Sequence, residues 1–311
     1  MTYARIVGTG SYLPERVVSN KDLEKTMDTT DEWIRERTGI KRRHIAADGE
    51  SSADMGLVAA QRAIEASGVE IADIDLIIVG TTTPEKVFPA TACIIQRRLG
   101  VGGCPAFDIQ AACSGFVFGL DLAKRQIETG GASCALVIGT EKLSSIVDWE
   151  DRGTAVLFGD GAGAVVLHAS DKPGILSTHI HSDGQYEDLL QVPVETGVIA
   201  MNGNAVFRKA VSMLDSMARE IIADNQFADG ELTWLVPHQA NMRIIAAAAK
   251  KTNMPMERVI VTVDEHANTS AASIPLALDV AVRDGRIKAG DILLLEAFGA
   301  GFTWGSALVR Y

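Results

Sequence analysis

The sequence predicts an α/β protein in which strands and helices alternate along most of its 311 residues. Short apolar runs rich in β-branched residues recur, and several are separated by segments whose apolar residues follow helical spacing. This alternation favours sheets with helices packed on their faces. The predicted strands are 4–8, 76–79, 135–138, 162–168, 234–236, 259–263, 292–295 and 306–311. The predicted helices are 52–67, 91–99, 114–128, 206–224, 242–251 and 273–284.

A second observation is that the chain repeats itself once. A predicted strand ends at Gly80 and another ends at His238, 158 positions later. The helix–turn–strand unit at 114–138 matches the unit at 273–295 with the same offset. A repeat of this size predicts a duplicated half. We therefore expect an N-terminal half at 1–172 and a C-terminal half at 173–311, with the ends of matched elements meeting in a cleft between them.

Composition narrows the classes of function. The content of 47% hydrophobic and 22% charged residues is that of a globular protein. A formal net charge of −11 disfavours nucleic acid and anionic membranes as partners. No apolar run reaches the roughly 18 residues of a membrane span, and residues 1–20 lack the pattern of a signal peptide. The four cysteines show no C-x-x-C pairing, so we expect reduced thiols in the cytoplasm.

Cys113 is the candidate nucleophile. It lies in Asp-Ile-Gln-Ala-Ala-Cys-Ser-Gly-Phe, where an apolar stretch gives way to a helical pattern. Unpaired N–H groups and the helix dipole at such a position favour the thiolate, which is the reactive form. The small neighbouring residues leave room for a substrate. Cys93, Cys104 and Cys134 lack this context and are interpreted as core residues.

Two further polar residues lie at the ends of predicted core elements. His238 follows Pro237 where a strand ends, and Asn268 precedes the predicted helix 273–284. A histidine of this kind is more often structural, and Asn268 alternatively caps the helix that follows. His266 is the rival for the role of Asn268. Cysteine, histidine and asparagine brought to one cleft would support covalent catalysis.

Three glycine-rich segments need separate interpretations. The run Gly159-Asp-Gly-Ala-Gly163 leads into a strand pattern, which favours a tight turn over a dinucleotide loop. Gly8-Thr-Gly10 is likewise not followed by a helix. The run Phe298-Gly-Ala-Gly-Phe302 follows a buried strand and is either a bend that needs small residues or a source of N–H groups for an oxyanion.

Taken together, these segments resemble the β-ketoacyl-acyl carrier protein synthase III family, the condensing enzymes that initiate bacterial type II fatty acid synthesis. The resemblance extends over essentially the whole chain. The segments that carry it are DTTDEWIRERTGI (28–40), VFPATAC (87–93), AACSGF (111–116), DRGTAVLFGDGAGA (151–164), VPHQANMRI (236–244), HANTSAAS (266–273) and EAFGAGFTWGSALVRY (296–311).

The resemblance implies a thiolase-like fold of five α-β-α-β-α layers built from two duplicated halves, and a homodimer. By position, Cys113 matches the acylated nucleophile, and His238 and Asn268 match the pair that handles the malonyl thioester. The matches to residues that bind coenzyme A are Thr29, Trp33, Arg37, Arg152, Asn204 and Asn241. Arg208 and Arg243 match the basic patch that docks acyl carrier protein, and Phe88 matches a residue contributed to the partner's acyl pocket.

The implied reaction transfers an acyl group, with acetyl as the expected one, from coenzyme A to Cys113 and then condenses it with malonyl-acyl carrier protein. The N–H groups of Cys113 and Ala300 would hold the oxyanion. The family often has glycine at the position of Ala300, and a positive φ would strain alanine there. No metal or redox cofactor is expected.

Several alternatives are weighed. A degradative thiolase needs a second cysteine late in the chain, and none follows Cys134. Elongating ketosynthases use two histidines, whereas hydroxymethylglutaryl-CoA synthases need a glutamate, for which Glu85 is the loose candidate. A non-catalytic carrier-binding module and a thioesterase are further alternatives. A related ketosynthase that uses longer acyl chains or serves specialised metabolism is the principal rival.

Overall fold

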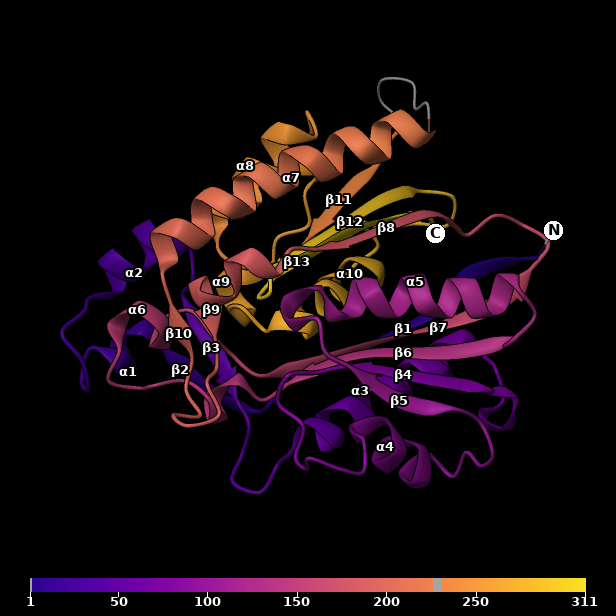
Figure 1. The fold of residues 1–311 in the computed structure, drawn as a ribbon, viewed down its shortest axis with the longest axis horizontal. Coiled ribbons are helices and arrows are strands. Elements are labelled where there is room, and N and C mark those ends of the chain that lie inside the picture. Colours follow the sequence, from indigo (N-terminus) through magenta and orange to yellow (C-terminus); the bar gives the residue numbers. More distant parts are fainter. Residues whose placement is uncertain (1, 226–230) are drawn as a thin grey trace.

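Two stacked sheets, with helices between them and on both outer faces, make up the computed structural model, which describes residues 2–225 and 231–311 (Figure 1). The first sheet has the order β1 (Tyr3–Tyr12), β7 (Gly161–Ser170), β6 (Cys134–Glu141), β4 (Leu76–Gly80), β5 (Ala106–Ile109). The second has the order β11 (Trp234–Pro237), β12 (Ile292–Gly299), β13 (Thr303–Arg310), β8 (Ile175–Ser182).

The helices complete five layers. Helices α5 (Gly115–Glu128) and α10 (Ser273–Arg283) fill the space between the sheets. The outer face of the first sheet is covered by α3 (Ser52–Ser67) and α4 (Thr91–Leu99), and that of the second by α7 (Gly203–Asn225) and α8 (Met242–Lys251). The α-β-α-β-α order implied by the resemblance is therefore confirmed.

Corresponding strands of the two sheets pair in the same register. Leu76 pairs with Ala135 in the parallel strands β4 and β6, and Trp234 pairs with Leu293 in β11 and β12. Both residues of the second pair lie 158 positions after those of the first, so the predicted repeat is confirmed. The chain passes from the first sheet to the second between Ser170 and Ile175. The division into halves at 1–172 and 173–311 stays a prediction.

Burial on both faces explains the composition of the central strands. β6 is buried at every position, which is typical of a strand with helices on both sides. Val137 faces α5 and α10, whereas Leu136 faces α3 and α4. The layer between the sheets joins both halves in one hydrophobic core, in which Phe116 of α5 and Leu278 of α10 are fully buried.

Helix bounds follow their local signals closely. α3 begins after a capping box formed by Ser51 and Asp54 and ends at Gly68, whose φ of 69° suits glycine. The predicted bounds of α3, α4 and α8 are confirmed. No helix in the described ranges combines the length and apolar character needed to cross a membrane.

The predicted strand at 259–263 is wrong. Val259 forms only an isolated bridge to Leu235, and the helix α9 (Val263–His266) begins where the strand was expected to end. The physical reason is the buried side chain of Gln239, whose Oε1 accepts the N–H groups of Thr262 at 2.8 Å and Val263 at 3.1 Å. These donors therefore need no sheet partner. The prediction also missed β5, β8 and the antiparallel pair of β2 (Arg16–Ser19) and β3 (Arg42–Ile45).

Candidate active site

Cys113 lies in a short turn, η2 (Ala112–Ser114), at the entrance to α5. The end of β12 crosses directly over this turn, because a Cβ added to Gly299 would lie 2.6 Å from the Cys113 backbone nitrogen. Thr303 Oγ1 donates to the Ala111 carbonyl at 2.8 Å, and Ser114 Oγ donates to the Thr303 carbonyl at 3.0 Å. The turn is therefore held between the two halves of the chain.

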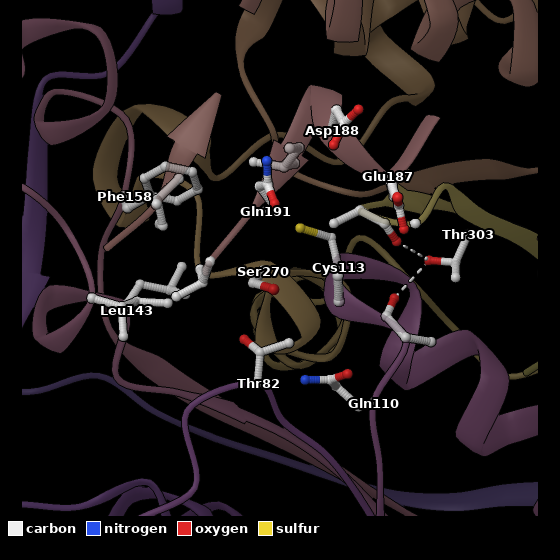
Figure 2. A pocket seen from close by; sticks show the side chains of 18 residues that line it. Thr82, Gln110, Cys113, Leu143, Phe158, Glu187, Asp188, Gln191, Ser270 and Thr303 are labelled. Carbon is white, nitrogen blue, oxygen red and sulfur yellow. Dashed lines mark hydrogen bonds between the residues drawn. The ribbon is translucent and has the colours of Figure 1, made fainter. Parts of the chain in front are cut away.

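Two cavities meet at Cys113. The first, of about 570 Å³, is lined by apolar side chains such as Leu143 and by polar ones such as Gln110 and Asp188, and Figure 2 shows it around the Cys113 sulfur. The second, of about 360 Å³, is lined by His238 and Asn268. Because Cys113 belongs to both linings, the candidate nucleophile lies between the two cavities.

His238 is buried and uncharged. Its backbone N–H donates to the Glu296 carbonyl at 2.7 Å, and its Nδ1 lies 2.6 Å from Ser273 Oγ. The Phe298 ring lies edge-on at 5.6 Å between centroids. Burial lowers the pKa of His238 to about 3, so the imidazole is neutral at ordinary pH.

Asn268 is fixed by its own neighbours. Its side-chain Oδ1 accepts the Ser270 N–H at 2.8 Å, and its backbone N–H donates to the Leu157 carbonyl at 2.9 Å. With Oδ1 engaged, the amide Nδ2 is the group left to donate toward the cavity. His266, the rival for this role, lines neither of the two cavities.

The environment of the Cys113 sulfur decides its protonation state. Burial raises the pKa of Cys113 to about 12, and the charge of Glu141 raises it further. Hydrogen bonding with the Ser270 hydroxyl and with the backbone N–H of Cys113 opposes this shift. The residue keeps some exposure to the cavities, yet desolvation is the largest effect. The N–H group at the start of the helix favours the thiolate, as expected, but burial outweighs this effect and keeps Cys113 a thiol.

The backbone at the predicted oxyanion site is unstrained at Ala300. Positive φ values occur at Gly301 and, among the described non-glycine residues, at Ala112, Asn253, Ala267 and Ser270. The methyl group of Ala300 therefore brings no left-handed strain. Ala300 and Gly301 line the first cavity together with Cys113.

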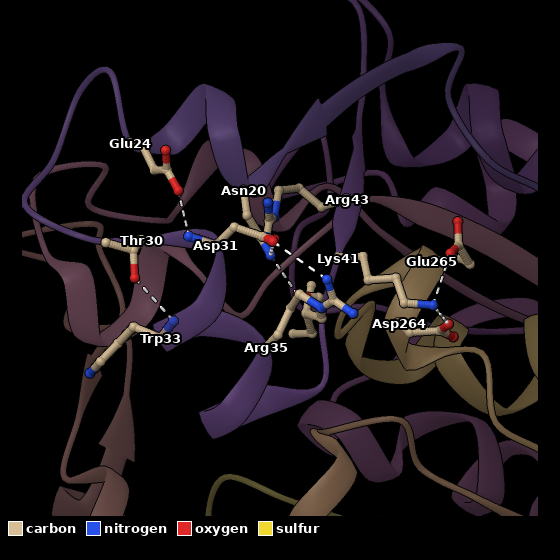
Figure 3. A network of polar contacts seen from close by, with 11 residues as sticks. Asn20, Glu24, Thr30, Asp31, Trp33, Arg35, Lys41, Arg43, Asp264 and Glu265 are labelled. Atoms are coloured by element: carbon tan, nitrogen blue, oxygen red, sulfur yellow. Dashed lines mark hydrogen bonds and ion pairs between the residues drawn. The ribbon is translucent and has the colours of Figure 1, made fainter.

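Helix α2 (Asp31–Thr38) contributes Trp33 to the second cavity. Thr30 caps the helix by accepting the Trp33 N–H at 3.1 Å, and Figure 3 shows this cap within a wider polar network. In that network Asn20 donates to Asp31 at 2.8 Å. Trp33 and Arg37 line the cavity.

Arg152 covers the Trp33 ring at 4.7 Å from its guanidinium carbon, and Arg37 lies at 5.6 Å. Trp33 and Arg152, predicted to hold adenine between them, thus contact each other directly. Thr29, predicted to contact coenzyme A, lines neither of the two cavities, and its buried hydroxyl has no hydrogen-bond partner among the described residues.

The remaining predicted residues are distributed around the second cavity or outside it. Asn204 and Asn241 line it, and Asn241 also caps α8 by accepting the Ile244 N–H at 3.1 Å. Arg243 lies over the Phe207 ring at 4.6 Å, and both residues belong to the lining. Arg208 is exposed on α7.

Phe88 is 82% exposed and lines neither cavity of its own chain. Glu85, the candidate acid of the hydroxymethylglutaryl-CoA synthase alternative, is exposed on the same segment and lines neither cavity. Among the described residues, no group of three or more histidine, cysteine, aspartate or glutamate side chains could hold a metal ion.

Glu141, Ser270 and Ser273 also surround the site, although no motif in the sequence marks them. In the sequence, Glu141 comes at the end of an apolar stretch, which is typical of the first surface residue after a strand. In the structure it is fully buried. Ser270 and Ser273 lie in the segment after Asn268, where their small side chains are compatible with an ordinary helix start. The repeat offers the only sequence signal, because it places Ser270 opposite Ala112 of the nucleophile turn.

Comparisons with known proteins agree with this geometry. The family model for 3-oxoacyl-[acyl-carrier-protein] synthase III matches residues 107–184. The family model for the C-terminal region of the same enzymes matches residues 222–311. A β-ketoacyl-[acyl-carrier-protein] synthase III from Thioalkalivibrio sulfidiphilus is 60% identical over the full length of both chains. The crystal structure of 3-oxoacyl-[acyl-carrier-protein] synthase III from Aquifex aeolicus is 48% identical with a TM-score of 0.96, covering 99% of this chain and 100% of that one.

A more distant match is the priming β-ketosynthase from the R1128 polyketide biosynthetic pathway, at 39% identity and a TM-score of 0.93, covering 99% of this chain and 96% of that one. Both the full-length identity and the cysteine between two cavities indicate the same family. The chain belongs to the 3-oxoacyl-[acyl-carrier-protein] synthase III family of condensing acyltransferases.

Proposed function

We propose that the protein condenses an acyl group, with acetyl as the first choice, from coenzyme A with malonyl-acyl carrier protein, through an acyl-Cys113 intermediate. The products are 3-oxoacyl-acyl carrier protein, coenzyme A and CO₂. The observation that carries the proposal is the position of Cys113 between two cavities, one of which is also lined by His238 and Asn268. A nucleophile reached from both sides suits a reaction in which an acyl chain stays bound while one thioester replaces another.

In the first half-reaction, the Cys113 sulfur attacks the thioester carbonyl of acyl-CoA. The oxyanion that develops accepts hydrogen bonds from the backbone N–H groups of Cys113 and Ala300. Donors of this kind need no reorganisation as the charge forms, and each contributes about 2.7–4 kcal/mol to lowering the barrier. Coenzyme A then leaves, and the acyl chain occupies the first cavity.

In the second half-reaction, malonyl loses CO₂ and its thioester oxygen becomes an enolate. A neutral His238 that accepts a hydrogen bond from Ser273 at Nδ1 carries its proton on Nε2 and can donate it to the enolate. Asn268 Nδ2 supplies a second neutral donor. Because neither group titrates near neutral pH, the stabilisation is the same across that range. The enolate carbon then attacks the acyl-Cys113 carbonyl.

The second cavity supplies the binding site for the carrier portion of both substrates. Trp33, Arg37 and Arg152 would hold the adenine end of coenzyme A, with Thr29 nearby, while Asn204 and Asn241 line the passage for pantetheine. Adenine would have to displace the Arg152 guanidinium from the Trp33 ring. Arg208 and Arg243 would dock the acidic acyl carrier protein through charge complementarity.

The proposal includes a cytoplasmic homodimer. Phe88 is almost entirely exposed on its own chain, as expected of a side chain that enters the partner's acyl pocket. A catalytic thiol that must stay reduced suits the cytoplasm. No cofactor is proposed, because acyl transfer and decarboxylation need only the donors and the nucleophile named above.

A ketosynthase for longer acyl chains or specialised metabolites is the second candidate. It is favoured by the size of the first cavity, since about 570 Å³ is in the range of pockets for ligands far larger than acetyl. The similarity to a priming ketosynthase of polyketide biosynthesis points in the same direction.

The test is a product assay with acyl-CoAs of about two to twelve carbons, malonyl-acyl carrier protein and mass spectrometry of the carrier. A 3-oxobutyryl carrier formed fastest from acetyl-CoA is the expected result. Fastest turnover with a longer chain would support the second candidate. Free fatty acid without any 3-oxoacyl carrier would contradict the condensation and indicate a thioesterase.

A further inference from the structure

A buried carboxylate, Glu141, lies at the end of β6 behind the nucleophile. It has no exposed surface, and every hydrogen-bond partner the structure gives it is a neutral donor. Thr83 Oγ1 donates to Oε2 at 2.6 Å, and the Thr82 backbone N–H donates to the same oxygen at 3.0 Å. The adjacent Lys142 directs its ammonium group to the Glu50 carbonyl at 2.7 Å. Glu141 thus accepts hydrogen bonds but forms no ion pair with any described residue.

Ser270 connects this carboxylate to Cys113. Its hydroxyl donates to Glu141 Oε1 at 3.1 Å and is also hydrogen-bonded to the Cys113 sulfur. Figure 2 shows Ser270 and Cys113 on the wall of the same cavity. Ser270 adopts a φ of 49°, an uncommon conformation for a residue with a side chain. Backbone strain of this kind is concentrated at functional sites.

The chemistry of the first half-reaction needs a proton acceptor at this place. Burial keeps Cys113 as a thiol, so its proton must leave as the sulfur attacks. His238 is a poor acceptor, because burial lowers its pKa to about 3. Burial raises the pKa of Glu141, which makes its carboxylate a better base than an exposed one.

We propose that Ser270 and Glu141 form a proton relay for Cys113, an inference that rests on the proposed function. As the sulfur–carbon bond forms, the Cys113 proton passes to Ser270 Oγ and the Ser270 hydroxyl proton passes to Glu141 Oε1. The carbon–sulfur bond to coenzyme A breaks, and coenzyme A leaves as a thiolate that takes a proton from solvent.

The second half-reaction returns the stored proton. The enolate carbon forms the new carbon–carbon bond, the Cys113 sulfur leaves with its electron pair, and Glu141 gives the proton back through Ser270. Over one turnover the relay is restored, and one solvent proton is consumed for each CO₂ released. In this account Ser270 and Glu141 act through Cys113 rather than by touching the substrate.

The experiment compares wild type with Glu141→Gln, Ser270→Ala and Ser270→Gly. Glycine tolerates the positive φ at position 270, so it removes the hydroxyl without adding backbone strain. Glu50→Gln, a substitution of the same type far from the sulfur, is the matched control. Single-turnover acylation by acetyl-CoA is followed by rapid quenching and intact mass, and iodoacetamide alkylation of Cys113 is followed between about pH 6 and 10.

We expect all three relay variants to acylate about 10²–10⁴-fold more slowly, the range for general acid–base catalysis, while Glu50→Gln is unchanged. Alkylation of Glu141→Gln should also be slower near neutral pH. If Glu141 acted only through its charge, its removal would lower the pKa of Cys113 and make alkylation faster, which would overturn the relay. Acylation at the wild-type rate in Ser270→Gly would overturn it as well.

Two controls separate this inference from other failures. Decarboxylation of malonyl-acyl carrier protein reports on a folded site, and the relay predicts that it persists in all three variants. If every variant lost decarboxylation as well as acylation, a role confined to Cys113 would be contradicted. A wild-type protein that is alkylated at Cys113 but never acylated by any acyl-CoA would reject the proposed function, while the alkylation profiles would still test the relay.

Discussion

The two halves of the molecule share a backbone plan but divide the chemistry between them. Ala112, before α5, and Ser270, before α10, lie 158 positions apart and adopt φ values of 45° and 49°. Gly80 and His238 are separated by the same offset, as are Gly115 and Ser273. Gly80 packs so closely on Gly115 that an added Cβ would lie 2.9 Å from its carbonyl carbon, whereas His238 meets Ser273 through a hydrogen bond.

The matched strand ends differ in the same way. Glu141 ends β6 and reaches Ser270 in the opposite half, while its counterpart Gly299 ends β12 and crosses the Cys113 turn. The first half thus contributes the nucleophile, and Gly299 of the second half packs against it without a side chain. The second half contributes His238 and Asn268, and Glu141 of the first half hydrogen-bonds to it through Ser270. The two halves therefore share one framework, and a few side chains at equivalent positions give each half its role.

The largest expected effect comes from removing the nucleophile. Cys113→Ala should form no acyl adduct with any acyl-CoA and no 3-oxoacyl carrier, because no other described cysteine lines either cavity. Intact mass and product assays check this. Cys93→Ala is the matched control and should keep both activities. Condensation by Cys113→Ala at the wild-type rate would show that the nucleophile is assigned wrongly.

His238→Ala tests the contribution of the second half. Acylation of Cys113 should persist, whereas decarboxylation of malonyl-acyl carrier protein should fall about 10²–10³-fold, the cost of losing one oxyanion donor. The contribution of His238 to the decarboxylation rate is the ratio of the wild-type rate to the His238→Ala rate. This ratio should not change between about pH 5 and 8, because the pKa of the ring is about 3. A variant unable to acylate would instead make His238 the base for the thiol.

Glu296 breaks the symmetry of the two halves within the core. Its counterpart is the buried Ile138, whereas neither oxygen of the buried Glu296 has a hydrogen-bond partner among the described residues. Burial raises the pKa of Glu296 from 4.5 to about 8. The folded state therefore keeps a proton that the unfolded state releases between these values, and stability falls as pH rises through that window.

Glu296→Gln should remove this dependence, since its amide is neutral in both states. The variant should be more stable than wild type by about 3 kcal/mol near pH 7, with the difference vanishing near pH 4.5. Chemical denaturation at several pH values measures it, and the titrations of His238 and His266 are common to both proteins. A difference that does not vary with pH would contradict an ionisable Glu296.

Gly299→Ala tests the close crossing of the nucleophile turn. The new Cβ would lie 2.6 Å from the Cys113 nitrogen, so the turn must shift, at a cost of about 1–3 kcal/mol in stability and with slower acylation. Gly102→Ala is the matched control, because a Cβ there meets nothing within 4 Å. Thermal melting and single-turnover acylation check both variants. Equal behaviour of the two would mean that the turn is not constrained.

The smallest expected effect is at the carrier surface. Arg243→Glu should weaken the use of malonyl-acyl carrier protein about tenfold, while malonyl-CoA is used almost as before. Arg219→Glu, which reverses an exposed arginine on α7 rather than on α8, serves as the control. Steady-state rates with both donors measure the difference. Equal losses for the two donors would argue against a docking role.

The framework was predictable from sequence because it depends on repeated apolar patterns and on caps. The bounds of α3, α4 and α8, and the offset of the repeat, follow from such local signals. The positions of Cys113, His238 and Asn268 at element ends were also visible. The burial of Glu141 and Glu296 was not, because a carboxylate after or within an apolar strand carries no local sign of what covers it. The high pKa of Cys113 likewise depends on burial and on the charge of Glu141, neither of which has a local signal in the sequence around the cysteine.

The measurement that tests the central claim most directly is peptide mapping of the protein after incubation with radiolabelled acetyl-CoA, followed by a chase with malonyl-acyl carrier protein. We expect one labelled peptide, with the label on Cys113, and complete transfer of the label to the carrier as a 3-oxoacyl group during the chase. Label on another residue, or label that leaves Cys113 only as free acetate, would contradict the account.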